Sequence, residues 1–412
     1  MSTGITRALC AAAAAGTFCA LGLAGAGAAG AASTAGQASG TPASARDSAA
    51  TVGLLASRAS SADPVTAYVA NQSSQTVTPI RAATGQAGTA IPAGANPAYI
   101  TITPDGKTAY VSNTREGMSP EDTVTPIQIA TGKAGKAITV GDDPGLVAIT
   151  PDGKTAYVAS QDGHAVYPIQ TATNTVGKPI RVGDSPEYIA ITPDGTTAYV
   201  TNSGSNTVTP IQTATGTAGQ PIKVGKGPRY IVITPNGETA YVANSSSNTV
   251  TPIQTATNTA GKPIRVGDSP DYIAITPNGK TAYVGNSYHR VTPIRTATNT
   301  ARTSIRVGKR ITMPEGPAFI TITPDGKTAY VLTDGAGRAR GRVTPIRTST
   351  DRTRDAIRVG RMPDFIAITP SGKTVYVANF LSGTVTRIRT ATDMRLKHVQ
   401  VGGGPDYIAM TP

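Results

Sequence analysis

The sequence contains no tryptophan, and its 412 residues include only two cysteines, three histidines and four phenylalanines. Both cysteines, Cys10 and Cys19, lie in an apolar N-terminal segment. For the rest of the chain this excludes a thiol nucleophile, a cysteine-ligated metal and a disulfide. No second apolar run of membrane-spanning length follows that segment. The folded part must therefore be held together by packing alone.

The N-terminal segment has the pattern of a secretory signal peptide. Arg7 precedes the stretch ALCAAAAAGTFCALGLAGAGAAGAAS, which contains Ala-x-Ala sites. We expect residues 1–32 to be removed on secretion, and an uncleaved membrane anchor is the alternative. Residues 33–63 are rich in Ala, Ser, Thr and Gly and are expected to form a flexible linker. Residues 64–412 would then be the folded domain of a secreted protein, either free or associated with the cell envelope.

A repeat governs this domain. Tyr-Val pairs recur in steps of 42, 47, 42, 42, 42, 47 and 46 residues, beginning at Tyr68, Tyr110, Tyr157, Tyr199, Tyr241, Tyr283, Tyr330 and Tyr376. Each unit reads as four short strands, such as YIAITP, TAYVAN, TVTPIQTAT and KPIRVG. A period in the forties with this pattern predicts an all-β fold, a β-propeller of four-stranded blades. The proline within the third strand predicts a bulge there.

The two ends of the repeat region complete each other. It opens on a second strand, Thr66 to Asn71, and closes on a lone first strand, Pro405 to Pro412. Pairing the N-terminal strands with the C-terminal strand would close the ring and leave no exposed sheet edge. This predicts eight blades. Seven blades are the alternative and would leave one unit outside the ring.

The strand sequence AYVTN at Ala198 to Asn202, with variants AYVAN and VYVAN, is similar to the signature of the YVTN family of β-propeller repeats. The resemblance covers residues 64 to 412 and implies a secreted or surface-layer protein. It also implies seven blades, the usual number in that family. Trp-Asp and kelch blades fit poorly, because the sequence has no tryptophan.

Length changes between the repeats fall on one face of the predicted ring. The spacing from third to fourth strand is constant, whereas the turns between strands two and three, and between four and the next strand one, vary. Loops on a rigid scaffold commonly carry binding sites, so we place function on the variable face. Mere tolerance of insertions there is the alternative.

Positive charge gathers at the C-terminal end of the chain. Residues 281–412 hold 20 Lys and Arg against 8 Asp and Glu, a net charge of +12 out of +13 for the whole sequence. Aromatic side chains accompany these charges in the variable loops. The predicted binding residues are Tyr288, Arg290, Arg338, Arg340, Arg342 and Phe380. They suit an anionic polymer, and a basic surface without a specific partner is the alternative.

A second candidate site lies at the predicted mouth of the central channel. The residue between the proline and the large apolar residue of each first strand would form a ring there: Ala98, Gly145, Glu187, Arg229, Asp271, Ala318, Asp364 and Asp406. Its charged members, Glu187, Arg229, Asp271, Asp364 and Asp406, can hold a cation or a polar ligand. Alternatively, acidic residues here serve only turn formation and solubility.

The histidines do not indicate a metal site or a catalytic site. His164 and His289 fall in loops of well-separated blades and His398 near the rim, so all three are expected to be exposed loop residues that share no metal. We assign no catalytic residue and expect neither a metal nor another cofactor.

The sequence therefore predicts a secreted, monomeric propeller that binds or scaffolds. Its expected partner is a cell-wall or acidic polysaccharide or another protein, with nucleic acid a weaker candidate, and its mature chain spans no membrane. The alternative function is a hydrolase or lyase, resembling lactonases, that acts at the channel mouth.

Overall fold

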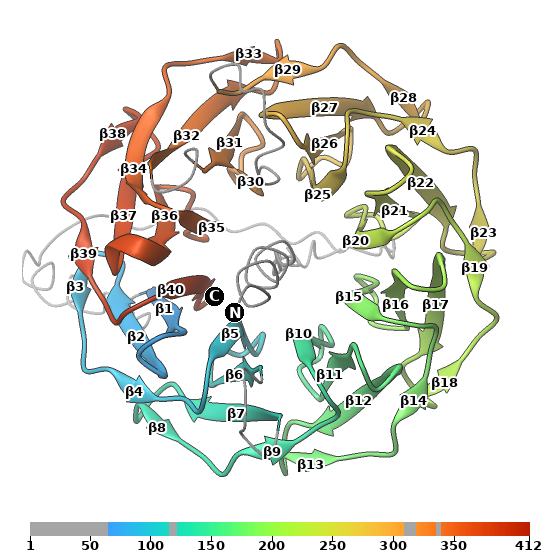
Figure 1. The fold of residues 1–412 in the computed structure, drawn as a ribbon, viewed down its shortest axis with the longest axis horizontal. Helices are drawn as coiled ribbons and strands as arrows, with labels where there is room; N and C mark the ends of the chain where they lie inside the picture. The colour runs from blue at the N-terminus through green and yellow to red at the C-terminus, as the bar shows by residue number, and fades with distance from the viewer. Residues whose placement is uncertain (1–64, 115–121, 309–318, 335–338) are drawn as a thin grey trace, which may run out of the picture. The chain divides into compact units, whose positions relative to one another are not determined.

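The structure, a computed structural model, describes residues 65–114, 122–308, 319–334 and 339–412. These residues form eight antiparallel sheets that follow one another around a ring (Figure 1). The prediction of an all-β propeller with eight blades is confirmed.

Each blade has an innermost strand A and, next to it, a strand B. The A strands are β5 (Pro97–Ile102), β10 (Pro144–Ile149), β15 (Pro186–Ile191), β20 (Pro228–Ile233), β25 (Pro270–Ile275), β30 (Phe319–Ile322), β35 (Pro363–Ile368) and β40 (Pro405–Met410). The B strands are β1 (Thr66–Asn71), β6 (Thr108–Asn113), β11 (Thr155–Ser160), β16 (Thr197–Asn202), β21 (Thr239–Asn244), β26 (Thr281–Asn286), β31 (Thr328–Thr333) and β36 (Thr374–Asn379).

Strand C lies outside strand B, and strand D at the rim is split into two short pieces. The C strands are β2 (Thr76–Arg81), β7 (Thr123–Gln128), β12 (Ala165–Gln170), β17 (Thr207–Gln212), β22 (Thr249–Gln254), β27 (Arg290–Arg295), β32 (Arg340–Arg347) and β37 (Thr384–Arg389). The D pieces are β3 (Gln86–Ala87) with β4 (Ile91–Pro92), β8 (Lys133–Ala134) with β9 (Ile138–Thr139), β13 (Thr175–Val176) with β14 (Ile180–Arg181), β18 (Thr217–Ala218) with β19 (Ile222–Lys223), β23 (Thr259–Ala260) with β24 (Ile264–Arg265), β28 (Thr300–Ala301) with β29 (Ile305–Arg306), β33 (Arg352–Thr353) with β34 (Ile357–Arg361), and β38 (Met394–Arg395) with β39 (Val399–Gln400).

We number the blades along the chain. Blade 1 combines β40 with β1–β4, and blades 2 to 8 follow as β5–β9, β10–β14, β15–β19, β20–β24, β25–β29, β30–β34 and β35–β39. The described residues contain no α-helix, only a short 3-10 turn, η2 (Phe380–Ser382). No helix in the described part of the chain is long and apolar enough to cross a membrane.

The proline of strand C breaks strand D rather than strand C. Pro210 pairs with Tyr199 in an uninterrupted register, so the predicted bulge in strand C is wrong. Strand D pairs with strand C on either side of the proline, at Ala218 and at Ile222. Proline offers no N–H to a neighbouring strand. The ladder therefore opens at this point, and only the carbonyl of Pro210 is bonded, accepting from Gly219 at 2.7 Å.

The tyrosine of strand B joins each blade to the next. Tyr199 is fully buried, and its hydroxyl donates to the carbonyl of Thr255 (3.2 Å) and lies 2.6 Å from Oδ1 of Asn258, both in the C–D turn of the following blade. Such a buried hydroxyl needs a partner, and the neighbouring turn supplies it. The repeated Tyr-Val pair therefore specifies contacts between blades as well as the core within each blade.

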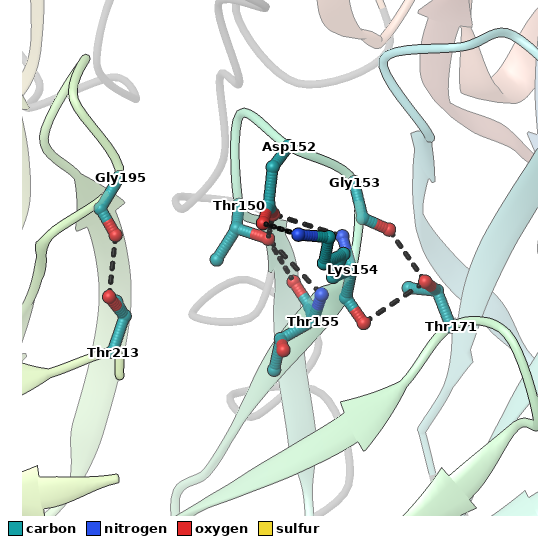
Figure 2. Close-up of polar contacts among 8 residues, drawn as sticks. All are labelled: Thr150, Asp152, Gly153, Lys154, Thr155, Thr171, Gly195 and Thr213. Carbon is teal, nitrogen blue, oxygen red and sulfur yellow. Dashed lines mark hydrogen bonds and ion pairs between the residues drawn. The ribbon is translucent and has the colours of Figure 1, made fainter. Parts of the chain in front are cut away.

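The A–B hairpins and C–D turns meet on one face of the ring, which we call the lower face. In blade 3 the hydroxyl of Thr150 donates to Asp152 at 2.6 Å, and the same carboxylate accepts from the backbone of Lys154 (Figure 2). Thr171, in the C–D turn, donates to the carbonyl of Gly153 at 2.6 Å. Most blades repeat this network, which explains why turn lengths on this face do not vary.

The B–C turns and D–A linkers meet on the opposite, upper face. The backbone of Ser203 donates to the carbonyl of Ser185 at 2.9 Å, and the hydroxyl of Ser205 accepts from Asp184 at 2.7 Å. The assignment of the variable turns to one face is therefore correct.

The chain termini close the ring inside blade 1. Strands β1 and β40, blue and dark red in Figure 1, pair in antiparallel register from Ala67 with Met410 onward, as predicted. A second contact seals the seam between blades 8 and 1. Arg387 stands where the other seven C strands have proline, is buried, and donates to the carbonyls of Ala82 (3.1 Å) and Thr84 (3.3 Å).

Candidate functional site

A regular bulge sets the inner rim of the upper face. In blades 1, 2, 4, 5, 6 and 8, one residue at the start of strand A is left out of the register with strand B. These residues are Asp406, Ala98, Glu187, Arg229, Asp271 and Asp364. A bulge re-aims the extra side chain away from the ladder. Six of the eight predicted channel-mouth residues thus share one structural position. In blade 3 both Gly145 and Leu146 are left out of the register, and Ala318 lies outside the described residues.

A collar of aromatic rings lies next to these residues along strand A. Neighbouring rings contact around the ring of blades, with centroid distances of 3.8–5.7 Å, in the order Tyr99, Tyr407, Phe365, Phe319, Tyr272, Tyr230 and Tyr188. Leu146 of blade 3, also buried, holds the equivalent position between Tyr188 and Tyr99. The acidic residues therefore stand on an apolar base that removes much of their hydration.

Glu187, Arg229 and Asp271 form an ionic cluster on consecutive blades. Asp271 is 4% exposed, and its Oδ1 lies 3.6 Å from Nη1 of Arg229. Burial raises the pKa of Asp271 to about 7, although Arg229 opposes the shift and Glu187 adds to it. Burial likewise raises the pKa of Glu187, against the attraction of Arg229. A carboxyl group with a pKa of about 7, as in Asp271, exchanges protons near neutral pH.

Asp364 and Asp406 form the other part of the rim, on blades 8 and 1. Burial, together with repulsion from Asp406 and Asp334, raises the pKa of Asp364 to about 8. Burial raises the pKa of Asp406 to about 7. Carboxyl groups with pKa values raised to this range are partly protonated at neutral pH. Among the residues that the structure describes, no group of three or more His, Asp or Glu side chains is placed to hold a metal ion.

The predicted basic residues belong to like-charged pairs on strands C and D. Arg290 lies directly opposite Arg306 in blade 6. In blade 7, Arg342 lies opposite Arg358 and Arg340 opposite Arg361. Of these six, Arg290, Arg306, Arg340, Arg342 and Arg358 make no ion pair within the described residues. Arg338 lies outside the described residues.

Tyr288 sits on an unusual B–C turn beside Arg290. Tyr288 and His289 both have left-handed backbones, with φ of 60° and 53°. A bulky residue rarely adopts this conformation, which costs about 1–2 kcal/mol. Tyr288 is 37% exposed on the turn. His289, by contrast, is buried with Nε2 3.8 Å from Oδ1 of Asp334, so the prediction of an exposed histidine is wrong there.

Phe380 lies beside the basic strands of blade 7. It begins η2, its backbone donates to Met362 at 2.8 Å, and the hydroxyl of Ser382 accepts from Arg361 at 2.8 Å. The structure thus brings Phe380 to the same edge as Arg340 and Arg342. Tyr288 and Arg290 form a separate patch on blade 6.

Three further arginines of the basic region have a structural role that the sequence reading missed. Arg302 pairs with Asp351 of the next blade at 2.8 Å, and Arg354 pairs with Asp393 at 3.0 Å. The third is Arg387 at the seam. The sequence contains a signal for these ion pairs. Where a C–D turn has Asp in place of Asn, strand D of the preceding blade has Arg in place of glycine. Part of the positive charge is therefore used in contacts between blades.

Two family models match parts of the chain. Residues 187–336 match the YNCE-like β-propeller, and residues 290–406 match the lactonase, 7-bladed β-propeller. The chain is thus similar to these propeller families, although its own ring has eight blades. No curated protein matches the chain.

Solved structures share the fold. Kuenenia stuttgartiensis hydrazine synthase is 25% identical, covers 65% of this chain and 90% of its own, and has a TM-score of 0.53. The dihydro-heme d1 dehydrogenase NirN is 13% identical, with coverage of 84% and 74% and a TM-score of 0.70. A Bacteroides fragilis protein provisionally named a 6-phosphogluconolactonase is 16% identical, with coverage of 86% and 99% and a TM-score of 0.59. At these identities the likeness speaks for the fold and not for activity.

Proposed function

We propose that this protein is a secreted, YVTN-type propeller that binds anionic polymers of the cell envelope through the upper edge of blades 6 and 7. The observation that carries the proposal is the set of cross-strand arginine pairs, Arg290 with Arg306 and Arg342 with Arg358. The signal-peptide pattern of residues 1–32 supports secretion.

These pairs have no evident structural purpose. Like charges directly opposite each other in a sheet destabilise it by some tenths of a kcal/mol. The position held by Arg290 and Arg342 is threonine or alanine in every other blade: Thr76, Thr123, Ala165, Thr207, Thr249 and Thr384. The fold therefore does not need an arginine there. A bound anion would turn the repulsion within each pair into shared attraction.

The chemistry of the pairs favours phosphate or carboxylate groups. Guanidinium groups bind both in two-point contacts, and each pair presents two of them to solvent. Tyr288 and Phe380 add aromatic surface at the same upper edge. A polymer with repeated phosphate or uronate groups matches this arrangement.

The test measures binding of the mature protein to purified teichoic acid and to polyuronate at low and physiological salt. Changing Arg290→Thr and Arg342→Thr installs the residue of other blades and should weaken binding about tenfold, because two cationic contacts are lost. The matched control, Thr207→Arg with Thr249→Arg, adds the same charge to blades 4 and 5. Equal affinity of all three proteins at physiological salt would contradict the proposal.

A second candidate function is hydrolysis of a lactone at the channel mouth. The lactonase match spans residues 290–406 and so includes Asp364 and Asp406, whose pKa values are raised to about 8 and about 7. One carboxyl group of such a pair can act as general base and the other as general acid. Turnover of a lactone panel that is lost in Asp364→Asn, with binding of polymers retained, would establish this function. An inert wild-type protein across pH 5 to 8 would exclude it for that panel.

A further inference from the structure

The last residue of strand C divides the ring into two halves. It is exposed in every blade and lies opposite the first residue of strand B in the same register. In blades 2 to 5 it is glutamine: Gln128, Gln170, Gln212 and Gln254. In blades 6, 7, 8 and 1 it is arginine: Arg295, Arg347, Arg389 and Arg81. The four arginines thus form one uninterrupted arc on the lower face, which crosses the seam of the ring.

The carboxylates of the lower face do not neutralise this arc. None of the four arginines makes an ion pair within the described residues. The acids Asp351 and Asp393 are already bound to Arg302 and Arg354. Asp325 pairs with Lys327 at 3.5 Å.

Hairpin acids are more frequent in the other half of the ring but are not confined to it. The A–B hairpins of blades 2, 3 and 4 carry Asp105, Asp152 and Asp194, and blade 5 carries Asn236. In the basic half, blades 6 and 8 carry Asn278 and Ser371, and blade 7 keeps Asp325. The C-strand arginines therefore make one half of the lower face more positive than the other.

From this arrangement we propose that Arg81, Arg295, Arg347 and Arg389 form a second binding track, on the lower face, for a linear polyanion. The inference rests on the proposed function for its ligand class, adds four residues on the other face, and takes both faces of the basic half to bind the same polymer chain. One arginine per blade at a constant position presents evenly repeated charge, which suits a chain of repeated anionic groups.

Arginines lie at both ends of the same C strands, and this favours a flexible polymer as the ligand over a flat anionic membrane. Arg342 and Arg347 lie on the same strand, β32, near its upper and lower ends. Arg290 and Arg295 stand likewise at the two ends of β27. A flexible polymer can follow these strands around the rim and contact both faces, whereas a flat surface can meet only one face at a time.

The experiment uses long-chain inorganic polyphosphate as the probe and measures its affinity over a range of salt concentrations. The lower-face variant carries Arg81→Gln, Arg295→Gln, Arg347→Gln and Arg389→Gln, which are the residues of the other four blades, so folding should persist. Loss of four phosphate contacts should reduce the slope of log affinity against log salt by about 3. The upper-face variant, Arg290→Thr with Arg342→Thr, should reduce it by about half that amount.

A charge-restored variant tests whether binding depends on the arc of four arginines or on the net charge of the protein. It adds Gln128→Arg, Gln170→Arg, Gln212→Arg and Gln254→Arg to the lower-face variant, which returns the net charge of the wild type. We expect affinity to stay low, because blades 2 to 5 lack the arginine pairs of the upper edge. Full recovery would overturn the track and indicate a general charge effect.

The remaining outcomes are also decisive. Wild-type binding by the lower-face variant with loss in the upper-face variant would overturn the track and leave the proposed function standing. Wild-type binding by both variants would overturn both. Binding to phosphatidylglycerol vesicles that depends on the four arginines, without binding to polyphosphate, would replace the polymer with a membrane surface.

Discussion

Blades 2 to 5 and blades 6, 7, 8 and 1 share one pattern of strands, turns and buried residues but differ in charge. In the first group, blades are joined by hydroxyl contacts such as Tyr199 with Asn258 at 2.6 Å. In the second group, arginines enter the same contacts, as Arg302 does with Asp351. Further arginines there, such as Arg290 and Arg342, make no ion pair within the part of the chain that the structure describes. The comparison separates charge that holds the ring together from charge that is free to bind a ligand.

The largest effect should come from opening the ring in blade 1. A chain that ends at Gly404 lacks β40, so β1 loses its inner partner and an edge of the sheet is exposed. We expect loss of the cooperative thermal transition, measured by circular dichroism. A chain that begins at Pro64 is the control and should unfold cooperatively; an unchanged transition in the truncated chain would contradict the closure.

The seam arginine should have the next largest effect. Arg387→Ala removes two hydrogen bonds from a buried cation to the carbonyls of Ala82 and Thr84. The free energy of unfolding should fall by about 2 kcal/mol, measured by urea denaturation. The exposed Arg389→Ala is the matched control and should change little. Equal values for the two would show that Arg387 does not seal the ring.

The rim carboxyl groups should make stability depend on pH. The folded-state pKa of Asp364, about 8, lies above its unfolded value, so the folded state binds more protons between about pH 4 and 8 and stability falls as pH rises through that range. Asp364→Asn should raise the free energy of unfolding at pH 8 by on the order of 1 kcal/mol and leave it nearly unchanged at pH 4. Urea denaturation at the two pH values provides the measurement.

Asp105, an acid on the lower face, should make stability depend on pH in the opposite direction. The hydrogen bond from Thr103 lowers the pKa of Asp105, so its contribution is present above its unfolded pKa and is lost as pH falls. Asp105→Asn should therefore destabilise slightly at neutral pH. The environments assigned to the two carboxyl groups would be refuted if Asp105→Asn stabilised the protein. They would also be refuted if Asp364→Asn left the free energy of unfolding at pH 8 unchanged.

The smallest effect should come from a substitution that makes one interface between blades in the basic half of the ring resemble the interfaces of blades 2 to 5. Asp351→Asn leaves the contact with Tyr283 but removes the ion pair with Arg302. Because both partners are partly exposed, we expect a loss of about 0.5–1 kcal/mol that shrinks at high salt. The converse Asn258→Asp adds a carboxylate where no arginine is available and should also destabilise. A loss independent of salt would argue against the ion pair.

The repeat predicted the fold well because buried positions recur with little change. The Tyr-Val pairs, the eight-blade count and the pairing of Thr66 to Asn71 with the C-terminal strand all follow from that recurrence. The channel-mouth positions were also found, since each stands one residue after a proline. Their pKa values were not predictable, because these depend on the aromatic collar assembled from different blades.

Other features depend on contacts between blades that the repeat does not reveal. The structural roles of Arg302 and Arg387 require the position of the next blade. His289 was expected to be exposed, but Asp334 of blade 7 lies beside it. The bulge was expected on the strand that contains the proline, whereas the interruption falls on its neighbour, which needs the missing N–H.

The most direct test of polymer binding is arginine footprinting. Phenylglyoxal labelling of the mature protein, with and without teichoic acid, reports each arginine by mass spectrometry. We expect protection of Arg290, Arg306 and Arg342 and none at Arg181 or Arg265 on blades 3 and 5. Uniform labelling around the ring, or protection confined to Arg229 at the channel mouth, would contradict binding through the basic half.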